Sequence, residues 1–245
     1  MSGHSHARTI KHQKDITDKK RGQMFSKMAR VISVAVKEGG ANPETNTKLK
    51  VAIEQAKGFN LPKENIERAI KQATGGGEGT NLEEVFFEAY GPGGIAIIIE
   101  GITDNKNRTL GEVKQILGQC GGKLVGEGSV KWLFEKKGCI TINQLLQNED
   151  FQNKEKLEIA AIEAGAEDVY WQDEMLDVYI KPELLEEIKK NLEAKNIKID
   201  SASLDWVAKE EISIDEKAKK SCQKLFETLD ENEAVQEIYS NIKLP

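Results

Sequence analysis

The sequence is poor in the residues that build covalent or metal-dependent scaffolds. Its three cysteines, Cys120, Cys139 and Cys222, are far apart and odd in number. This spacing predicts neither a disulfide framework nor a zinc site, and it favours a reducing compartment. The longest apolar run, Ile95–Ile99, has five residues, well short of the roughly 18 needed to span a bilayer. We therefore expect a soluble, cytoplasmic protein with no membrane partner.

Histidine is also scarce, which weakens any catalytic hypothesis. His4, His6 and His12 are the only three, and all lie near the N-terminus. The sequence contains no recognisable Ser-His-acid set, metal triad or isolated carboxylate pair, so we predict no enzyme activity, no small-molecule substrate and no cofactor. A hydrolase would need His12 beside a carboxylate. Ser2-Gly3-His4 could wrap Cu(II) or Ni(II) if Met1 were removed, but any chain with His third can do so, and we predict no metal site.

The glycine clusters do not match phosphate-binding loops. Gly91–Gly94 lies between two expected strands, Gly126-x-Gly128 lacks a following Gly-Lys-Ser/Thr, and Gly75–Gly79 follows no strand. We interpret all three as turns or linkers. Asp104–Thr109 opens an expected helix and could hold an anion there, but an Asn or Asp N-cap is the favoured interpretation.

Charge is divided unevenly along the 245 residues. The whole chain is 31% charged and 38% hydrophobic, with a net charge of −6. Residues 1–80 contain 15 Lys+Arg and 8 Asp+Glu, a net of +7, whereas residues 81–245 contain 20 and 33, a net of −13. Such a division indicates an electrostatic binding surface at one end of the chain, and phosphates are its natural partner.

The N-terminal third predicts a small helical bundle. Apolar residues recur at helical spacing from Gly22 to Lys37. Asn42-Pro43 should begin a second helix that ends at Lys57, and Pro62 a third that the Gly75–Gly77 run closes.

Beyond residue 80 the pattern changes to mixed helices and strands. Before Gly138 the expected order is ββαβ, with the last strand ending in Val130–Phe134. From Cys139 to Val207 it is βαββαβ, the order of a ferredoxin-like unit, and one helix and one strand remain. We therefore predict an α+β multidomain fold: a three-helix bundle followed by two ferredoxin-like domains, the second inserted in the first. The predicted parts are a basic arm (1–21), a helical domain (22–75), a linker (76–80), an α+β domain (81–137 plus 210–245) and an inserted domain (138–209).

Basic residues are concentrated in the arm and the first helix. The spacing of positions 20, 27, 30 and 37 keeps them on one helical stripe, away from Met28 and Ile32. Clustered, solvent-facing cations suit phosphate binding, although Lys-rich helix faces are often simply solvated. The predicted nucleic-acid-binding residues are Arg8, Lys11, His12, Lys14, Lys19, Lys20, Arg21, Lys27, Arg30 and Lys37.

Several longer motifs occur in a fixed order along the chain. They are Gly3-His4-Ser5-His6, Ile10-Lys11-His12-x-Lys14, Lys20-Arg21-Gly22-x-x-Phe25-Ser26-Lys27, Asn60-Leu61-Pro62-x-x-Asn65-Ile66-x-Arg68-Ala69-Ile70, Tyr90-Gly91-Pro92-Gly93-Gly94, Thr103-Asp104-Asn105-x-Asn107-Arg108-Thr109 and Gly128-Ser129-Val130. Through these motifs the chain resembles the YebC/PmpR family, whose mitochondrial relatives include the translational activator of cytochrome c oxidase.

The resemblance implies a cytoplasmic, non-enzymatic, three-domain protein that binds DNA as a probable transcriptional regulator. The alternative it implies is a ribosome-associated translation factor that binds ribosomal RNA and relieves stalling at proline-rich stretches. The residues leave DNA and RNA open, because no helix-turn-helix reading helix is identifiable. A protein-assembly factor whose basic arm docks on an acidic protein is a further alternative. Ala7 stands where the family usually has Trp, so a stacking contact made by that Trp cannot be carried over.

Overall fold

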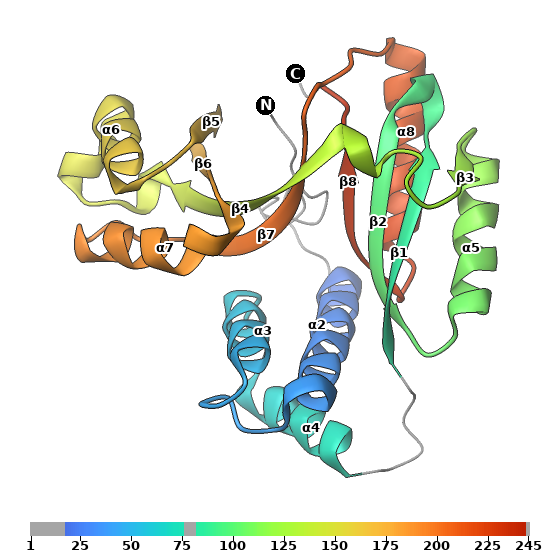
Figure 1. Cartoon of the computed structure of the whole chain (residues 1–245), viewed down its shortest axis with the longest axis horizontal. Helices are drawn as coiled ribbons and strands as arrows, with labels where there is room; N and C mark the ends of the chain where they lie inside the picture. Colours follow the sequence, from blue (N-terminus) through green and yellow to red (C-terminus); the bar gives the residue numbers. More distant parts are fainter. Residues whose placement is uncertain (1–17, 76–81, 244–245) are drawn as a thin grey trace. The chain divides into compact units, whose positions relative to one another are not determined.

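A computed structural model describes residues 18–75 and 82–243, with side chains from Arg21 onward. The described chain forms two compact units (Figure 1). One is Leu133–Glu211, and the other combines the helical N-terminal part and the first sheet with Ile212–Lys243. Residues 1–17 of the predicted arm lie outside the described residues, and so does the predicted linker (76–80). No helix of the described ranges is both long and apolar enough to cross a bilayer.

The helical domain consists of α2 (Asp18–Gly39), α3 (Thr47–Gly58) and α4 (Lys63–Thr74). All three contribute apolar residues at helical spacing to one core. Its fully or almost fully buried members are Met28, Ile32, Ala35, Val36, Leu49, Ala52, Ala56, Leu61, Ile66 and Ala69.

The start of α3 differs from the prediction. Asn46, not Asn42, is the N-cap: its side chain accepts the Leu49 N–H at 3.0 Å. The Asn46 amide also donates to the carbonyls of Ala35 and Gly40, both at 2.7 Å. Asn46 is only 5% exposed, and because it joins two helix ends, it fixes the α2–α3 corner. Asn42 instead forms a turn with Glu44.

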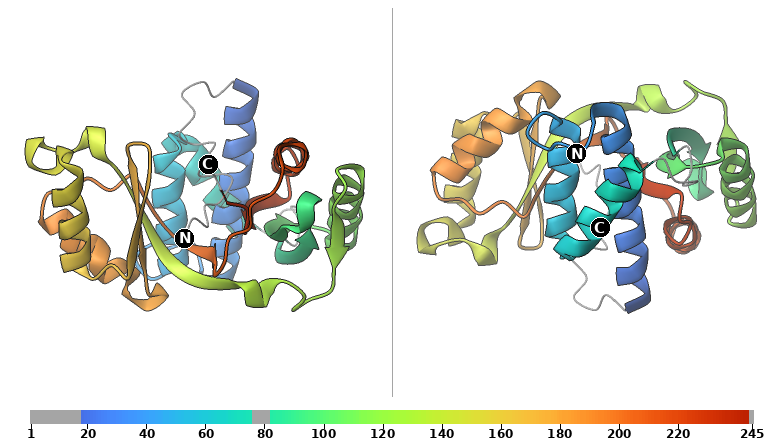
Figure 2. Two further views of the ribbon diagram at one scale, coloured as in Figure 1. Left: turned by 90° about the horizontal axis from the view of Figure 1, so that it is seen from above. Right: turned by 90° about the horizontal axis from the view of Figure 1, so that it is seen from below.

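The first sheet is entirely antiparallel, with the order β3-β1-β2-β8. Its strands are β1 (Glu83–Tyr90), β2 (Ala96–Thr103), β3 (Lys123–Val125) and β8 (Val235–Ser240). The helices α5 (Lys106–Gln119) and α8 (Glu216–Asp230) lie side by side against it (Figure 2). The β2-α5-β3 connection skips β1 in the sheet, which is the split βαβ arrangement of a ferredoxin-like domain, and β8, which follows α8, lies beside β2.

The predicted strand ending in Val130–Phe134 is wrong. β3 occupies Lys123–Val125 instead, and Lys131–Leu133 forms the single 3-10 turn η2. The reason lies in the backbone hydrogen bonds, because the N–H groups of Gly128, Val130 and Lys131 are all taken by the side chain of Glu88. Such N–H groups cannot pair in a ladder.

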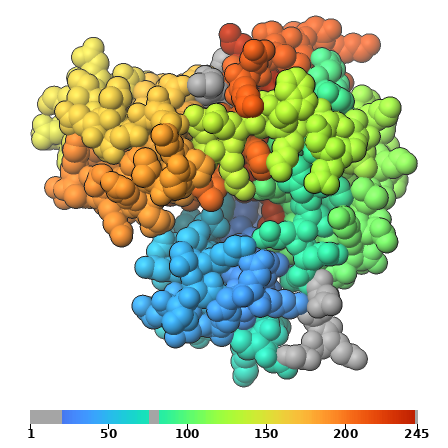
Figure 3. Space-filling model, in the orientation of Figure 1, coloured from blue at the N-terminus to red at the C-terminus, as the bar shows by residue number. Residues whose placement is uncertain are grey.

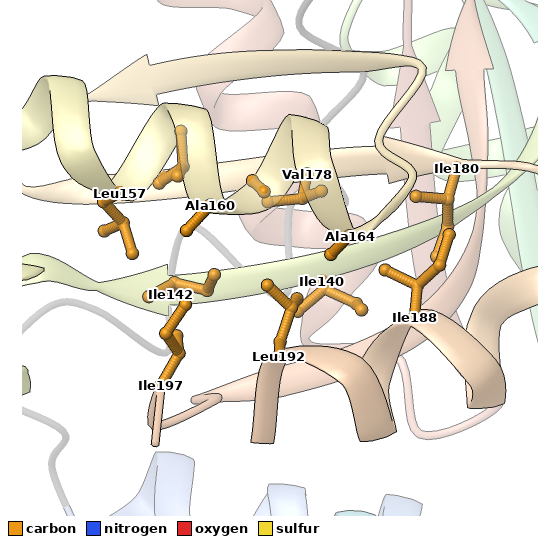
Figure 4. Close-up of a cluster of buried hydrophobic side chains, with 12 residues drawn as sticks. Ile140, Ile142, Leu157, Ala160, Ala164, Val178, Ile180, Ile188, Leu192 and Ile197 are labelled. Carbon is orange, nitrogen blue, oxygen red and sulfur yellow. The ribbon is translucent and has the colours of Figure 1, made fainter. Parts of the chain in front are cut away.

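The inserted domain follows as β4 (Phe134–Asn143), α6 (Lys154–Ala164), β5 (Asp168–Gln172), β6 (Met175–Ile180), α7 (Leu185–Ala194) and β7 (Ser201–Ala208). Its strand order, β5-β6-β4-β7, is that of the ferredoxin-like fold. Figure 4 shows its core, where Leu157 and Ala160 of α6 and Leu192 of α7 point toward Ile140 and Ile142 of β4. The remaining single turns are η1 (Pro92–Gly94), η3 (Gln144–Leu146), η4 (Glu149–Gln152) and η5 (Pro182–Leu184).

The predicted fold class is confirmed: a helical domain precedes two ferredoxin-like α+β domains, the second inserted in the first. One strand boundary is corrected, because β4 begins at Phe134 rather than at Cys139. Lys136-Lys137-Gly138 resembles a turn in the sequence, yet Gly138 lies within the strand. A Cβ there would approach Ile180 Cγ1 to 2.7 Å, so glycine serves close packing rather than a turn.

Candidate nucleic-acid interface

The structure describes only some of the predicted basic residues. Arg8, Lys11, His12 and Lys14 lie outside the described residues. Lys19 and Lys20 belong to the first turn of α2, without described side chains. Arg21 and Lys37 are exposed near the two ends of α2.

Lys27 does not face solvent as the stripe pattern predicted. It is 4% exposed, and its Nζ lies 2.6 Å from Oδ1 of Asp230, the last residue of α8. A buried ammonium needs such a partner, because desolvation of an unpaired charge is costly. Lys27 therefore joins α2 to α8 in this structure, and its expected exposure to phosphates is corrected.

Arg30, one turn further along α2, is also bonded to residues outside its own helix. Its Nη1 donates to the Ile102 carbonyl at 3.2 Å, and its Nη2 lies 2.9 Å from Glu233 Oε2. Val34 follows on the same face and is 6% exposed, outside the main helical core. α2 consequently has a second buried face. Val34, seven residues after Lys27, is the signal in the sequence that could have shown it.

α3 and α4 lie at the surface in the space-filling view (Figure 3). Both helices carry exposed cations that are not engaged as Lys27 and Arg30 are. Lys50 and Lys57 are two helical turns apart on one face of α3, and Arg68 and Lys71 are one turn apart on α4. All four are exposed and form no ion pair with another residue that the structure describes. Sequence reasoning concentrated on α2 and did not single out these four.

α4 also presents a face of base-reading residue types. Asn65, Arg68 and Gln72 are spaced by three and four residues, so they share one face. Arg68 and Gln72 are exposed and Asn65 is half-buried. Arg pairs with guanine edges, and Asn or Gln with adenine edges, in the DNA major groove. The spacing of Asn65, Arg68 and Gln72 is a signal that the sequence contains, but the sequence analysis identified no recognition helix.

The connection from α3 to α4 has the length of a helix-turn-helix connection. Four residues, 59–62, separate Gly58 from Lys63, and helix-turn-helix turns have about three to four. Asn60 has φ 58°, the left-handed conformation that asparagine tolerates better than most residues. The Leu61 side chain is buried in the helical core. This turn holds α4 with its outer face accessible.

The Asp104–Thr109 segment is a helix cap, as favoured from the sequence. Asn105 Oδ1 accepts the Arg108 N–H at 3.0 Å, and the Thr103 hydroxyl accepts the Asn105 N–H at 3.0 Å. The Arg108 guanidinium is hydrogen-bonded to Asp104 and lowers the pKa of that carboxyl. Asn105 therefore caps α5, and the Arg108 guanidinium is engaged by Asp104.

The three cysteines are free thiols. Burial raises the pKa of Cys222 to about 11, and its Sγ lies 3.4 Å from the Pro92 carbonyl. Within the described ranges, no cluster of His, Cys, Asp and Glu has the arrangement of a metal site. The histidines lie outside those ranges.

The comparisons with known proteins place this arrangement in a family. Residues 5–76 match the family model described as the TACO1/YebC protein N-terminal domain, and residues 82–242 match the TACO1/YebC second and third domain. The chain is 46% identical to a probable transcriptional regulatory protein of Persephonella marina and 44% identical to one of Trichlorobacter lovleyi. Each alignment covers all of this chain and 96% of the relative.

A solved structure agrees with the fold. The crystal structure of a conserved hypothetical protein from Aquifex aeolicus has a TM-score of 0.87 and 43% sequence identity, covering 96% of each chain. The resemblance to the YebC/PmpR family is thus confirmed over nearly the whole length. The chain belongs to the TACO1/YebC family.

Proposed function

We propose that the protein is a cytoplasmic regulator that binds DNA through its basic N-terminal region and acts by binding rather than by catalysis. The observation that carries this proposal is the set of exposed, unengaged cations Lys50, Lys57, Arg68 and Lys71 on α3 and α4. Phosphate contacts from such residues provide affinity through counterion release. The names of the relatives, probable transcriptional regulatory protein, are consistent with it.

Sequence preference would come from the outer face of α4. Asn65, Arg68 and Gln72 would read base edges in the major groove, with α3 beside the phosphate backbone. Lys27 and Arg30 support this indirectly, because their ion pairs with Asp230 and Glu233 hold α2. The predicted arm residues would add phosphate contacts. Arg21 and Lys37 remain predicted contacts at the ends of α2.

The second candidate is a ribosome-associated translation factor that binds ribosomal RNA. One observation favours it: the exposed Glu64 and Glu67 lie in the first turns of α4. Their charges oppose deep insertion of this helix between two phosphate backbones. The wide, shallow minor groove of an RNA helix demands less insertion.

Two substitutions on α4 test the DNA proposal. We expect Arg68→Ala to relax preference at one base position, with a loss of about 1–3 kcal/mol on the preferred site only. Lys71→Ala should weaken binding to all sequences about equally. Fluorescence anisotropy on selected and scrambled duplexes measures both. Lys63→Ala is the matched control, because its exposed ammonium already lies 3.6 Å from Glu67.

The salt dependence of binding and crosslinking in cells complete the test. If about six phosphates are neutralised, log K should fall with log salt at a slope of roughly −5. Binding that ignores both salt and the α4 substitutions would reject the proposal. Recovery of large-subunit ribosomal RNA, rather than discrete promoter fragments, after crosslinking in cells would select the second candidate.

A further inference from the structure

The helix α8 carries a row of lysines on its outward face. Lys217, Lys220 and Lys224 are spaced by three and four residues, so they share one face of the helix. All three are exposed. The buried residues of α8, among them Cys222 and Leu225, lie on the opposite face. We refer to the three lysines as the α8 stripe.

The carboxylates at pairing distance along α8 are already engaged. Glu216 lies 2.8 Å from the Lys219 Nζ, and Glu227 accepts from the Gln223 amide at 3.1 Å. The α8 stripe itself forms no ion pair with a residue that the structure describes. From Glu216 to Lys224 the helix has four Lys and one Glu, a net of +3. The α8 stripe is therefore a local positive patch.

This patch is compatible with the net charge of −13 over residues 81–245. Residues 134–208 alone supply −8 of that charge, from 17 Asp+Glu and 9 Lys+Arg. The helix α5, which lies beside α8 on the first sheet (Figure 2), has three Lys+Arg and one Glu, a net of +2. Exposed charges more than about 8 Å apart are largely screened at physiological salt. The lysines of α8 thus dominate the potential at their own surface.

The positions of these lysines are electrostatically unfavourable for the helix. Lys217 and Lys220, and likewise Lys220 and Lys224, are like charges at neighbouring helical positions, which destabilise a helix. Lys217 also lies in the first turn of α8, where the positive end of the helix dipole disfavours a cation. Because no ion pair of the described residues relieves this repulsion, the arrangement favours an anion from outside the chain.

We propose that the α8 stripe is a second phosphate-binding surface, which lies against the backbone of a nucleic-acid duplex. An α-helix rises 1.5 Å per residue, so the stripe spans about 10 Å. One strand of B-DNA presents a phosphate about every 3.4 Å along its axis, so about three phosphates face three lysines. The inference rests on the proposed function, because it assumes that nucleic acid is bound; it adds a contact outside the N-terminal region.

The test compares the α8 stripe with lysines of the inserted domain that are also exposed and form no ion pair with a described residue. The stripe variant carries Lys217→Gln, Lys220→Gln and Lys224→Gln. The control variant, which has the same net charge, carries Lys181→Gln, Lys190→Gln and Lys198→Gln.

Fluorescence anisotropy of the full chain on mixed-sequence DNA and RNA duplexes measures the effect. We expect the stripe variant to bind at least about tenfold more weakly at low salt. Its slope of log K against log salt should be shallower by about 2.7, which corresponds to three lost phosphate contacts. The control variant should keep the wild-type slope. A loss on either duplex supports the inference and identifies the backbone that α8 contacts.

Acetylation of lysines, mapped by mass spectrometry, provides a readout on the unaltered protein. Bound duplex should remove most of the reactivity of the α8 stripe and leave that of the control lysines unchanged. Urea unfolding should show the stripe variant to be no less stable than the control variant, because it removes like-charge neighbours. Lower stability would show that the lysines are engaged within the fold, and it would overturn the inference.

The outcomes separate the two proposals. Wild-type binding that Lys71→Ala weakens and the stripe variant does not would overturn the second surface and leave the proposed function standing. The reverse result would support the α8 stripe and reject the α4 surface. Equal losses in the stripe and control variants would indicate a general charge effect and overturn the inference. Wild-type protein that binds neither duplex would reject both proposals. Unchanged duplex binding with lost binding of polyglutamate would reassign the stripe to an acidic protein.

Discussion

Glu88 is a buried acid in the middle of the first sheet whose charge is retained. Burial alone would raise the pKa of its carboxyl group, but hydrogen bonds from the backbone of Val130, Gly128 and Lys131 outweigh burial and lower it. No periodicity indicates this role, because a Glu in an alternating strand predicts a solvent-facing position. Its partners lie about 40 residues later, which a local pattern cannot reveal.

The Glu88 carboxylate should make stability depend on pH. A carboxyl whose folded-state pKa lies below its unfolded-state value stabilises the fold above that unfolded value, about 4.3 for Glu, and the contribution is lost as pH falls through the folded-state pKa. We expect Glu88→Gln to lower the free energy of unfolding at pH 7 by about 1–3 kcal/mol. The variant should also lose part of the fall in stability below about pH 4.3. Urea unfolding between pH 3 and 7 measures both effects.

Glu127→Gln is the matched control for this measurement, because Glu127 is exposed on the same loop. We expect it to change stability by no more than about 0.5 kcal/mol. If the two variants behave alike, the anchoring role of Glu88 is wrong.

In α2, helical periodicity predicts one of the two buried faces and misses the other. The main core face, with Met28 and Ile32, follows from the spacing of apolar residues and was predicted. The second face was not, because Lys27 and Arg30 have the residue type of a solvated surface. Their partners Asp230 and Glu233 are 203 residues away. Only Val34 on that face hinted at burial.

The Lys27–Asp230 pair should be strongly coupled. Removing one partner of a buried pair leaves an uncompensated charge, so we expect Lys27→Met to cost about 3 kcal/mol, and Asp230→Leu a similar amount. The double variant should cost less than either single one, since no lone charge remains. A double-mutant cycle from urea unfolding gives the coupling energy.

The Lys48–Glu38 pair supplies the comparison, because its side chains are 63% and 44% exposed. Its coupling should be at most about 1 kcal/mol, because solvent screens exposed charges. Equal coupling energies for the two pairs would show that Lys27 is solvated in solution.

Other elements differ in how well the sequence predicts them. The βαββαβ order of the inserted domain was predicted correctly, because its helices and strands have the periodicity of their kind. β3 was misplaced, since Lys123–Val125 has only three residues and little periodicity. The Asn46 cap was missed because Asn42-Pro43 is the stronger local signal. The face of α4 that carries Asn65, Arg68 and Gln72 was not predicted, because its exposure depends on the turn at Asn60, which the structure shows.

At the scale of the whole molecule, the inserted domain is joined to the chain through one ladder. Leu133 O accepts the Lys209 N–H at 2.9 Å, and Phe134 pairs with Ala208 in the same register. The two ends of the segment are therefore adjacent. Its core draws on its own residues, such as Ile140, Leu157 and Leu192.

Excision of residues 134–208 should leave a folded protein. The first sheet keeps its four strands, and a two-residue Asn-Gly turn can join Leu133 to Lys209 across the paired strands. We expect a single cooperative urea transition. The removed segment has 17 Asp+Glu and 9 Lys+Arg, so the net charge changes from −6 to +2. Duplex DNA should consequently bind more tightly at low salt, measured by anisotropy. Weaker binding would show that the segment contributes contacts of its own.

The paired tether also has a consequence for proteolysis. Because the polypeptide crosses into the inserted domain once and returns beside its point of entry, a single nick in either crossing strand leaves the domain covalently attached. Two cuts are required to liberate it. A digest should therefore pass through a nicked species of unchanged native mass, whose two polypeptides are held together by the β2–β8 pairing of the first sheet, before the inserted domain is released.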